Sequence, residues 1–137
     1  MKIAIVSDKE MLAVIPLAMP MLRKSFKLSD GRHSQESVTE LLTSRKGQLW
    51  VAIEDGKIIM ALVSEIRVYP ELKTLAILLC GGIKMHLWLD DLIAKLKDVS
   101  GRHEIEKIET IGRPGWVRAL RSHGFVEKPV YFLECKV

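Results

Sequence analysis

The middle of the chain carries three apolar runs that are separated by turn signals. Residues 49–53, 58–69 and 72–79 are apolar at nearly every position rather than at alternate ones. A strand with this pattern has both of its faces covered, as in a sheet that is wrapped by helices. The Asp55-Gly56 pair favours a tight hairpin between the first two runs. These features predict the central sheet of an α/β domain.

A mostly apolar helix is expected before this sheet, over residues 11–22. Pro16 and Pro20 each remove a backbone donor and clash with the preceding turn, so the helix is expected to be kinked or split. Its apolar character indicates burial against the sheet or against a partner.

The remaining elements follow from caps, turn residues and hydrophobic periodicity. They are a strand at 3–6, a helix with a capping box from Ser37 to Glu40 and an end at Gly47, a helix at 84–99, a strand at 105–111, a helix from Pro114 to Gly124, and a strand at 130–137. The predicted order is β-α-α-β-β-β-α-β-α-β, a mixed α/β (α+β) sheet. With 137 residues, the chain fits one domain.

Composition narrows the class of partner. The net charge of +4, from 21 basic and 17 acidic residues, suits an anionic ligand. Nucleic acid is not favoured, because no basic run is interleaved with aromatic residues. Cys80 and Cys135 lie in apolar, strand-like surroundings without metal-ligand spacing and are expected to be reduced and buried. The sequence suggests neither a signal peptide nor a membrane span, so we expect a cytoplasmic protein.

A strand, a Gly-Gly turn and a helix follow one another near residue 80. A helix N-terminus offers unpaired N–H groups and a positive dipole end, and glycine lets the backbone approach a phosphate. The segment is therefore a candidate cradle for a pyrophosphate, with an ordinary turn as the alternative. The candidate binding residues are Leu79, Cys80, Gly81, Gly82, Ile83 and Lys84.

The order of elements resembles the GNAT superfamily of N-acetyltransferases. In that family the fourth strand splays from the fifth, acetyl-CoA enters the V-shaped gap, and its pyrophosphate rests on the loop before the third helix. Residues 72–79 and 105–111 would correspond to these two strands, and the segment from Gly112 to Phe125 resembles the late helix of the family. The resemblance implies the GNAT fold with acetyl-CoA as cofactor. It places Arg113 at the mouth of the cleft, where this side chain is a candidate to pair with a phosphate, with an ordinary surface arginine as the alternative.

A narrower resemblance is to GNAT-like proteins encoded by bacteriophages and prophages, some of which are virion components. It is carried by residues 78–82, the Trp-Leu helix and the Gly-Arg-x-Gly-Trp run at 112–116. Two positions depart from the family pattern. The loop at 80–86 lacks the Arg or Gln and the second spaced glycine, and Leu120 stands where the family often has a tyrosine that acts as general acid.

Acetyl transfer needs a base for the amine proton and a donor to the carbonyl oxygen. Glu65 and Glu109 are the candidate bases, each with a solvated or salt-bridged carboxylate as its alternative role. A backbone N–H near Leu79 or Cys80 is the candidate oxyanion donor. His86 and His123 are expected at the surface, and Trp88 breaks the apolar stripe of its helix and is expected to mark a partner surface.

Two functions from different classes remain. One is an acetyl-CoA-dependent N-acetyltransferase acting on an amine. The other is a catalytically inactive GNAT-fold binding protein, such as a phage virion or assembly component with a protein partner. A homodimer through the apolar first helix or the final strand is a further candidate arrangement.

Overall fold

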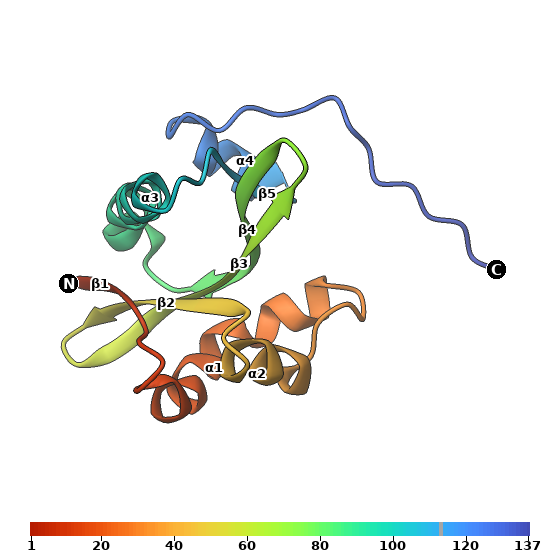
Figure 1. The fold of residues 1–137 in the computed structure, drawn as a ribbon. Coiled ribbons are helices and arrows are strands. Elements are labelled where there is room, and N and C mark those ends of the chain that lie inside the picture. Colours follow the sequence, from red (N-terminus) through yellow and green to blue (C-terminus); the bar gives the residue numbers. More distant parts are fainter. Residues whose placement is uncertain (113) are drawn as a thin grey trace.

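A five-stranded mixed sheet with helices on both faces forms the centre of the computed structural model, which describes residues 1–112 and 114–137 (Figure 1). The elements are β1 (Lys2–Ile5), α1 (Met11–Leu28), α2 (Gln35–Thr43), β2 (Gly47–Glu54), β3 (Lys57–Tyr69), β4 (Leu72–Gly82), α3 (Met85–Arg102), β5 (Lys107–Thr110) and α4 (Pro114–Arg121). This confirms the predicted α/β class with its mixed central sheet. The chain order also agrees with the prediction, except at the final strand.

The sheet changes character at β4. Strands β1 to β4 are antiparallel neighbours, whereas β4 and β5 are parallel. Their pairing runs only from Thr74, opposite Lys107, to Ile77, opposite Thr110. Beyond Ile77, β4 continues to Gly82 with β3 as its neighbour, while β5 has ended. The two parallel strands therefore part halfway along β4.

Each face of the sheet has its own core, which confirms the expectation drawn from the continuous apolar runs. One core packs α1 and α2 on the sheet, and the other packs α3 and α4 on the opposite face. Trp50 is buried in the second core, and its indole Nε1 donates to the hydroxyl of Ser64 at 2.9 Å. That hydroxyl in turn donates to Gln48, so the buried polar pair is satisfied.

Helix α1 is one continuous helix of 18 residues. The expected split into two helices is therefore not present. Pro16 and Pro20 both lie on its exposed side. The carbonyl groups that each proline leaves without a partner lie four residues earlier, on that same side, where water can satisfy them. The prolines are tolerated because the affected face of the helix is exposed to solvent.

Several boundaries differ from the predicted ones. The capping box of α2 begins three residues earlier than expected, because Ser34 and Ser37 cap each other reciprocally. The helix ends at Thr43, before Gly47. Helix α3 runs through Gly101 to Arg102 rather than ending at residue 99. Residues 105 and 106 precede β5, yet Ile105 is still buried in the core.

The predicted strand over residues 130–137 is wrong for this structure. The segment is extended and exposed, and it runs away from the sheet to the C-terminus (Figure 1). Its composition favours a strand, but strand structure also needs a neighbouring strand for its N–H and C=O groups. No other part of the described chain lies beside it as a strand partner.

Within the described residues, no helix combines the length and hydropathy needed to cross a membrane.

Gly81 sets how closely α1 approaches the sheet. A Cβ atom at this position would lie 2.0 Å from the main-chain oxygen of Met21 in α1. We predict that Gly81→Ala lowers the free energy of unfolding by about 2–3 kcal/mol, because backbone has to move. Equilibrium unfolding in urea measures this change.

Gly101→Ala is the matched control. A Cβ there meets nothing within 4 Å, and the residue lies in the last turn of α3. This variant is expected to gain about 0.5–1 kcal/mol from helix propensity. Equal effects of the two variants would contradict the close packing of α1 on β4.

Candidate functional site

A cleft of about 1050 Å³ opens where β4 and β5 part. It is lined by the end of α1 and the loop after it, by β4 and β5, by one residue of β3, by the first residue of α3, by the start of α4 and by the C-terminal segment. Its described lining residues are Ser25, Leu28, Ser29, Arg32, His33, Arg67, Ala76, Ile77, Leu78, Leu79, Cys80, Met85, Glu109, Thr110, Ile111, Gly112, Gly115, Trp116, Lys128 and Phe132.

A β-bulge causes the strands to part. Val63 of β3 pairs with Leu79, and the next residue, Ser64, pairs with Ile77, so Leu78 is the extra residue. An extra residue bends and twists the bulged strand. On the other side of the gap, the hydroxyl of Thr110 donates to the main-chain oxygen of Ile77 at 3.2 Å, at the last paired position.

Leu79 and Cys80, two of the predicted cofactor-binding residues, line this gap. Strand β5 does not pair with them, so the main chain of β4 here has a strand neighbour only on its β3 side. Main-chain groups on the open side are available to a ligand. The Ser25 hydroxyl donates to the Cys80 oxygen at 3.0 Å and fixes α1 at this point.

Glycine is needed at positions 81 and 82 for close packing, a role that the sequence did not reveal. Gly81 and Gly82 belong to β4 and pair with Ala61 and Met60. A Cβ on Gly82 would lie 2.6 Å from the oxygen of Ile59, and Gly81 allows the close approach of α1. Neither glycine is among the lining residues of the cleft. The glycines therefore serve close backbone packing, next to the cleft rather than in it.

The start of α3 faces the same cleft through Met85. Lys84 precedes it in the left-handed conformation with φ of 55°, and no side chain caps the helix. The Lys84 ammonium lies 2.9 Å from a carboxylate oxygen of Glu54, and neither Ile83 nor Lys84 lines the cleft. The uncapped first turn of α3 thus presents main-chain N–H groups without a side-chain acceptor.

Trp88 does not mark a partner surface, contrary to the prediction. It is 3% exposed, and its indole N–H donates to the main-chain oxygen of Ile83 at 2.7 Å. Because that bond ties the helix back to the loop before it, Trp88 holds the first turn of α3 in place. Trp116, by contrast, both packs against the core and lines the cleft.

Glu65 and Glu109, the two predicted bases, are brought together by the register of the sheet. Both pair with Ala76, one from β3 and one from β5. Arg67 lies between them, with its Nε 2.9 Å from Glu65 and a terminal nitrogen 3.9 Å from Glu109. The Thr74 hydroxyl donates to Glu109 at 3.0 Å. Glu109 lines the cleft directly, whereas Glu65 reaches it through Arg67.

The guanidinium of Arg67 keeps its positive charge in this group. Partial burial acts against the charge of Arg67, but the hydrogen bond and the negative charge of Glu65 outweigh it and raise the pKa of the guanidinium. Arg67 is therefore a permanent cation beside Glu109.

The other sequence candidates are placed differently. His86 is exposed on the first turn of α3, as expected. His123 is half-buried instead, with its Nε2 2.7 Å from Asp90 of α3, so it joins the end of α4 to α3. Leu120 is buried in the core. Arg113 lies outside the described residues.

Burial raises the pKa of the Cys80 thiol to about 12. The thiol is therefore protonated at neutral pH, which makes it a poor nucleophile. Cys135 is exposed rather than buried, contrary to the expectation, because it lies on the unpaired C-terminal segment.

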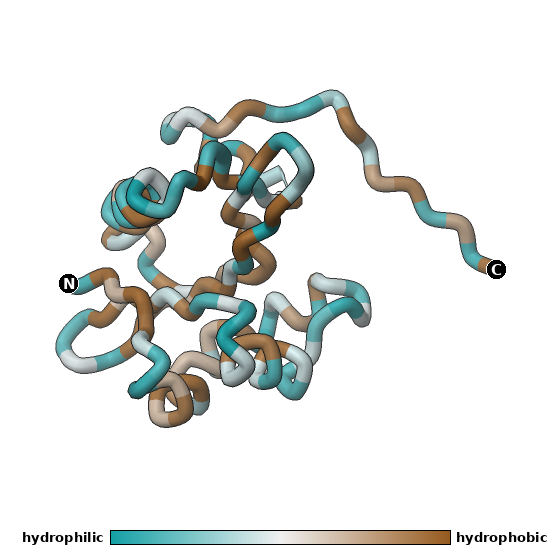
Figure 2. Tube along the Cα trace, in the orientation of Figure 1, coloured by the Kyte–Doolittle hydropathy of each residue, from teal (hydrophilic) through white to brown (hydrophobic). Residues whose placement is uncertain are grey.

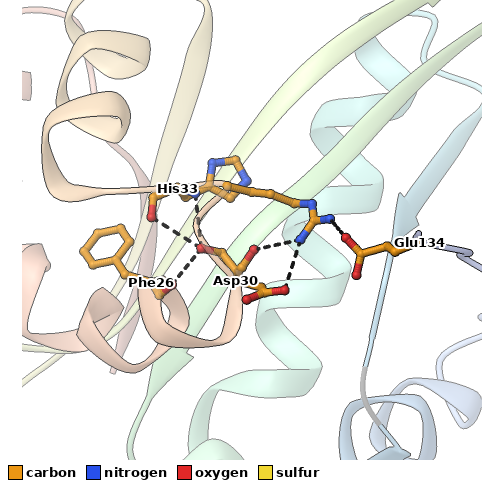
Figure 3. Close-up of polar contacts among 6 residues, drawn as sticks. Phe26, Asp30, His33 and Glu134 are labelled. Atoms are coloured by element: carbon orange, nitrogen blue, oxygen red, sulfur yellow. Dashed lines mark hydrogen bonds and ion pairs between the residues drawn. The ribbon is translucent and has the colours of Figure 1, made fainter. Parts of the chain in front are cut away.

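A network of polar contacts builds the outer wall of the cleft (Figure 3). The Ser29 hydroxyl donates to the main-chain oxygens of Phe26 and His33 and so shapes the loop after α1. From this loop, Arg32 forms ion pairs with Asp30 and with Glu134 of the C-terminal segment, and its guanidinium lies 4.9 Å from the ring centre of Phe132. This wall was not foreseen from the sequence, because its residues lie about 100 positions apart.

Comparison with known proteins gave no matching family model and no matching curated protein. Solved structures do match. A ribosomal-protein-alanine N-acetyltransferase from Brucella melitensis biovar Abortus 2308 covers 100% of this chain and 100% of its own, with a TM-score of 0.70 at 15% identity. A predicted acetyltransferase with acetyl-CoA from Clostridium acetobutylicum covers 98% and 95%, with a TM-score of 0.69 at 14% identity.

An aminoglycoside acetyltransferase from an uncultured soil metagenomic sample covers 99% of this chain and 97% of its own, with a TM-score of 0.71 at 19% identity. These identities are low, and the likeness is one of architecture over the whole chain. Together with the parted parallel strands and the bulge in β4, it shows that this chain has the fold of the GNAT acetyltransferases.

Proposed function

We propose that this chain binds acetyl-CoA in the cleft between β4 and β5 and transfers the acetyl group to an amine. The observation that carries the proposal is the coincidence of two features at one cleft. The parted strands leave main-chain groups open at Leu79 and Cys80, and the uncapped start of α3 faces the same space. The solved acetyltransferases of the same fold support it.

The cofactor fits the donor set in chemical terms. Main-chain N–H groups at the start of α3 and the positive end of its dipole suit a pyrophosphate. Main-chain groups beside Leu79 suit an extended amide-containing chain, and Trp116 offers an apolar surface. When bound, acetyl-CoA supplies a thioester whose carbonyl carbon accepts the amine nitrogen as the bond to sulfur breaks.

Glu109 is our candidate for the proton-accepting group. Its carboxylate lines the cleft, and contacts with Thr74 and Arg67 fix its orientation. It can take a proton from the amine nitrogen that attacks the thioester, directly or through one water molecule. Glu65 is then a positioning residue, because it contacts Arg67 rather than the cleft.

One observation favours a second candidate function. Leu120 stands where the family often has a tyrosine that acts as general acid. Its side chain is buried and has no proton to donate to a departing thiolate. A protein of this kind can bind the cofactor or a protein partner without catalysis. The sequence resembles GNAT-like proteins of phages, and a role as a virion or assembly component belongs to this second candidate.

The first prediction concerns cofactor binding. Met85→Glu places a carboxylate in the first turn of α3, at the cleft. An acidic residue suits a helix N-terminus, so the free protein stays folded, but it repels a pyrophosphate. Millimolar acetyl-CoA is expected to raise the Tm of the wild type and not that of the variant, as measured by thermal denaturation.

Ala94→Glu adds the same charge on an exposed site of the same helix and should keep the full Tm shift. A substitution at Gly82 would not test cofactor binding, because any side chain there meets β3. If Met85→Glu retains the wild-type shift, the pyrophosphate does not lie at the start of α3.

The second prediction concerns the base. Glu109→Gln should lower kcat for acetyl transfer by about 10²–10³-fold, in the range for loss of a general base, while the Tm shift with acetyl-CoA remains. Release of free CoA thiol with a panel of primary amines measures the rate. Glu106→Gln, an exposed carboxylate just before β5, is the control and should be unaffected.

The outcomes separate the two candidate functions. Wild-type turnover that survives Glu109→Gln rejects Glu109 as the base. Wild-type protein that shows the Tm shift but no turnover with any amine rejects the transferase and supports binding without catalysis.

The third prediction concerns Cys80. Because burial raises the pKa of its thiol to about 12, Cys80 should resist alkylation by iodoacetamide at pH 8, while exposed Cys135 reacts. Mass spectrometry of the two peptides measures the labelling. Rapid labelling of Cys80 in the folded protein would contradict the raised pKa of its thiol.

A further inference from the structure

One face of the sheet brings a cation and a carboxylate into the cleft. Glu65 and Arg67 lie on the face of β3 that α1 and α2 cover, because Val63, two residues earlier, packs in that core. Glu109 of β5 lies on the same face, since it and Glu65 both pair with Ala76. Arg67 and Glu109 both line the cleft. The cleft therefore has a floor of opposite charges.

The contacts of Arg67 within the protein do not use all of its donors. Its Nε donates to Glu65 at 2.9 Å, whereas a terminal nitrogen lies 3.9 Å from Glu109, which exceeds hydrogen-bond distance. A guanidinium has five N–H donors in a planar fork that fits a carboxylate. The Arg67 side chain is 42% exposed, so donors remain for a carboxylate that a ligand supplies.

The strand between these two charged groups contributes only small side chains. Ala76 of β4 pairs with Glu109, and its side chain is a single methyl group. Thr74 pairs with Arg67, is fully buried, and its hydroxyl is engaged with Glu109. A small ligand can therefore contact the guanidinium and the carboxylate at once.

The outer wall of the cleft is hydrophilic and basic. The loop after α1, residues 29–34, has no apolar side chain, and Figure 2 colours it teal to white. Among the described residues that line the cleft, Arg32, Arg67 and Lys128 are basic and only Glu109 is acidic. This excess of positive charge disfavours a polycationic acceptor and favours one that carries a negative charge of its own.

We propose that the acceptor is a free amino acid, whose carboxylate binds Arg67 while its amine lies at Glu109. This inference rests on the proposed transferase function. Among the described residues, Arg67 is the one cation within ion-pair distance of Glu109, whereas Arg32 is already paired with Asp30 and Glu134. An amine and a carboxylate on one carbon atom match a carboxylate and a guanidinium that lie this close together. Arg67 is then a specificity-determining residue.

The transfer to an amino acid balances with these groups. The amine nitrogen forms a bond to the thioester carbonyl carbon as the carbon–sulfur bond breaks. One amine proton passes to Glu109 and on to solvent, and the departing thiolate takes a proton from solvent, since Leu120 has none to donate. The products are an N-acetyl amino acid and CoA with a free thiol. The carboxylate on Arg67 is unchanged, so Arg67 acts in recognition.

Acetylation of the proteinogenic amino acids as free acids and as amides tests the proposal, with release of CoA thiol as the readout. An amide keeps the amine and the side chain but removes the negative charge. The preference is the ratio of kcat/KM for the acid to kcat/KM for its amide, and intrinsic reactivities cancel when two proteins are compared. Arg67→Gln should lower the wild-type preference by about 10–100-fold, as expected for loss of a hydrogen bond to a charged group.

Arg102→Gln is the matched control. Arg102 is an exposed arginine at the end of α3 that pairs with Asp98 and does not line the cleft, so its loss should leave the preference unchanged. Arg67→Lys keeps the charge without the planar fork and should retain part of the preference. If Arg67 only positions Glu109, Arg67→Gln lowers turnover of acids and amides by the same factor, and that result overturns the proposal.

Binding measurements separate failure of this proposal from failure of the transferase function. With CoA present, at least one free amino acid should raise the Tm of the wild type more than its amide does, whether or not turnover occurs. A wild type that acetylates amides or other amines but no free amino acid keeps the transferase function and overturns the acceptor class. If no amine at all is acetylated, the transferase function fails, and the absence of a Tm shift with every free amino acid then overturns the acceptor class as well.

Discussion

The interruption of hydrogen bonding between β4 and β5 is the constraint on which the rest of this structure depends. Two parallel strands that pair over four residues would continue to pair if their main chains stayed parallel. The extra residue at Leu78 bends β4 at the end of that pairing. The molecule therefore holds unpaired main-chain groups at the centre of a folded sheet, in a place where side chains from both faces can surround them.

The packing around β4 maintains this opening. Helix α1 lies directly on the main chain at Gly81, and Ser25 binds the oxygen of Cys80, so β4 cannot shift back toward β5 without losing both contacts. On the opposite face, Trp88 binds the loop that leads into α3. The bent strand and the start of α3 are thus held by well-buried groups, which allows the cleft to be preformed rather than assembled on binding.

The candidate catalytic groups lie at the end of the cleft where β4 and β5 still pair. Register places Glu65 and Glu109 on either side of Ala76, and Arg67 joins them. The positive charge of Arg67 therefore lies between the two carboxylates and contacts both of them. The arrangement keeps Glu109 oriented toward the cleft, while the wall formed by Arg32 and Phe132 closes the other side.

The sequence by itself determined the α/β class, the antiparallel hairpins and the coverage of both sheet faces, because continuous apolar runs and the Asp55-Gly56 turn are local signals. The parted strands were expected only from the resemblance to the GNAT superfamily, whereas Leu79 and Cys80 were candidates from the strand, Gly-Gly turn and helix. The sequence misjudged Trp88, the packing role of Gly81 and Gly82, and the final strand. Each of these features depends on residues that are distant in the chain. Trp88, for example, is buried by a core that strands β2, β3 and β4 provide. Strand pairing, close helix approach and the Glu109 network arise only when separate elements meet, and no local pattern specifies which elements those are.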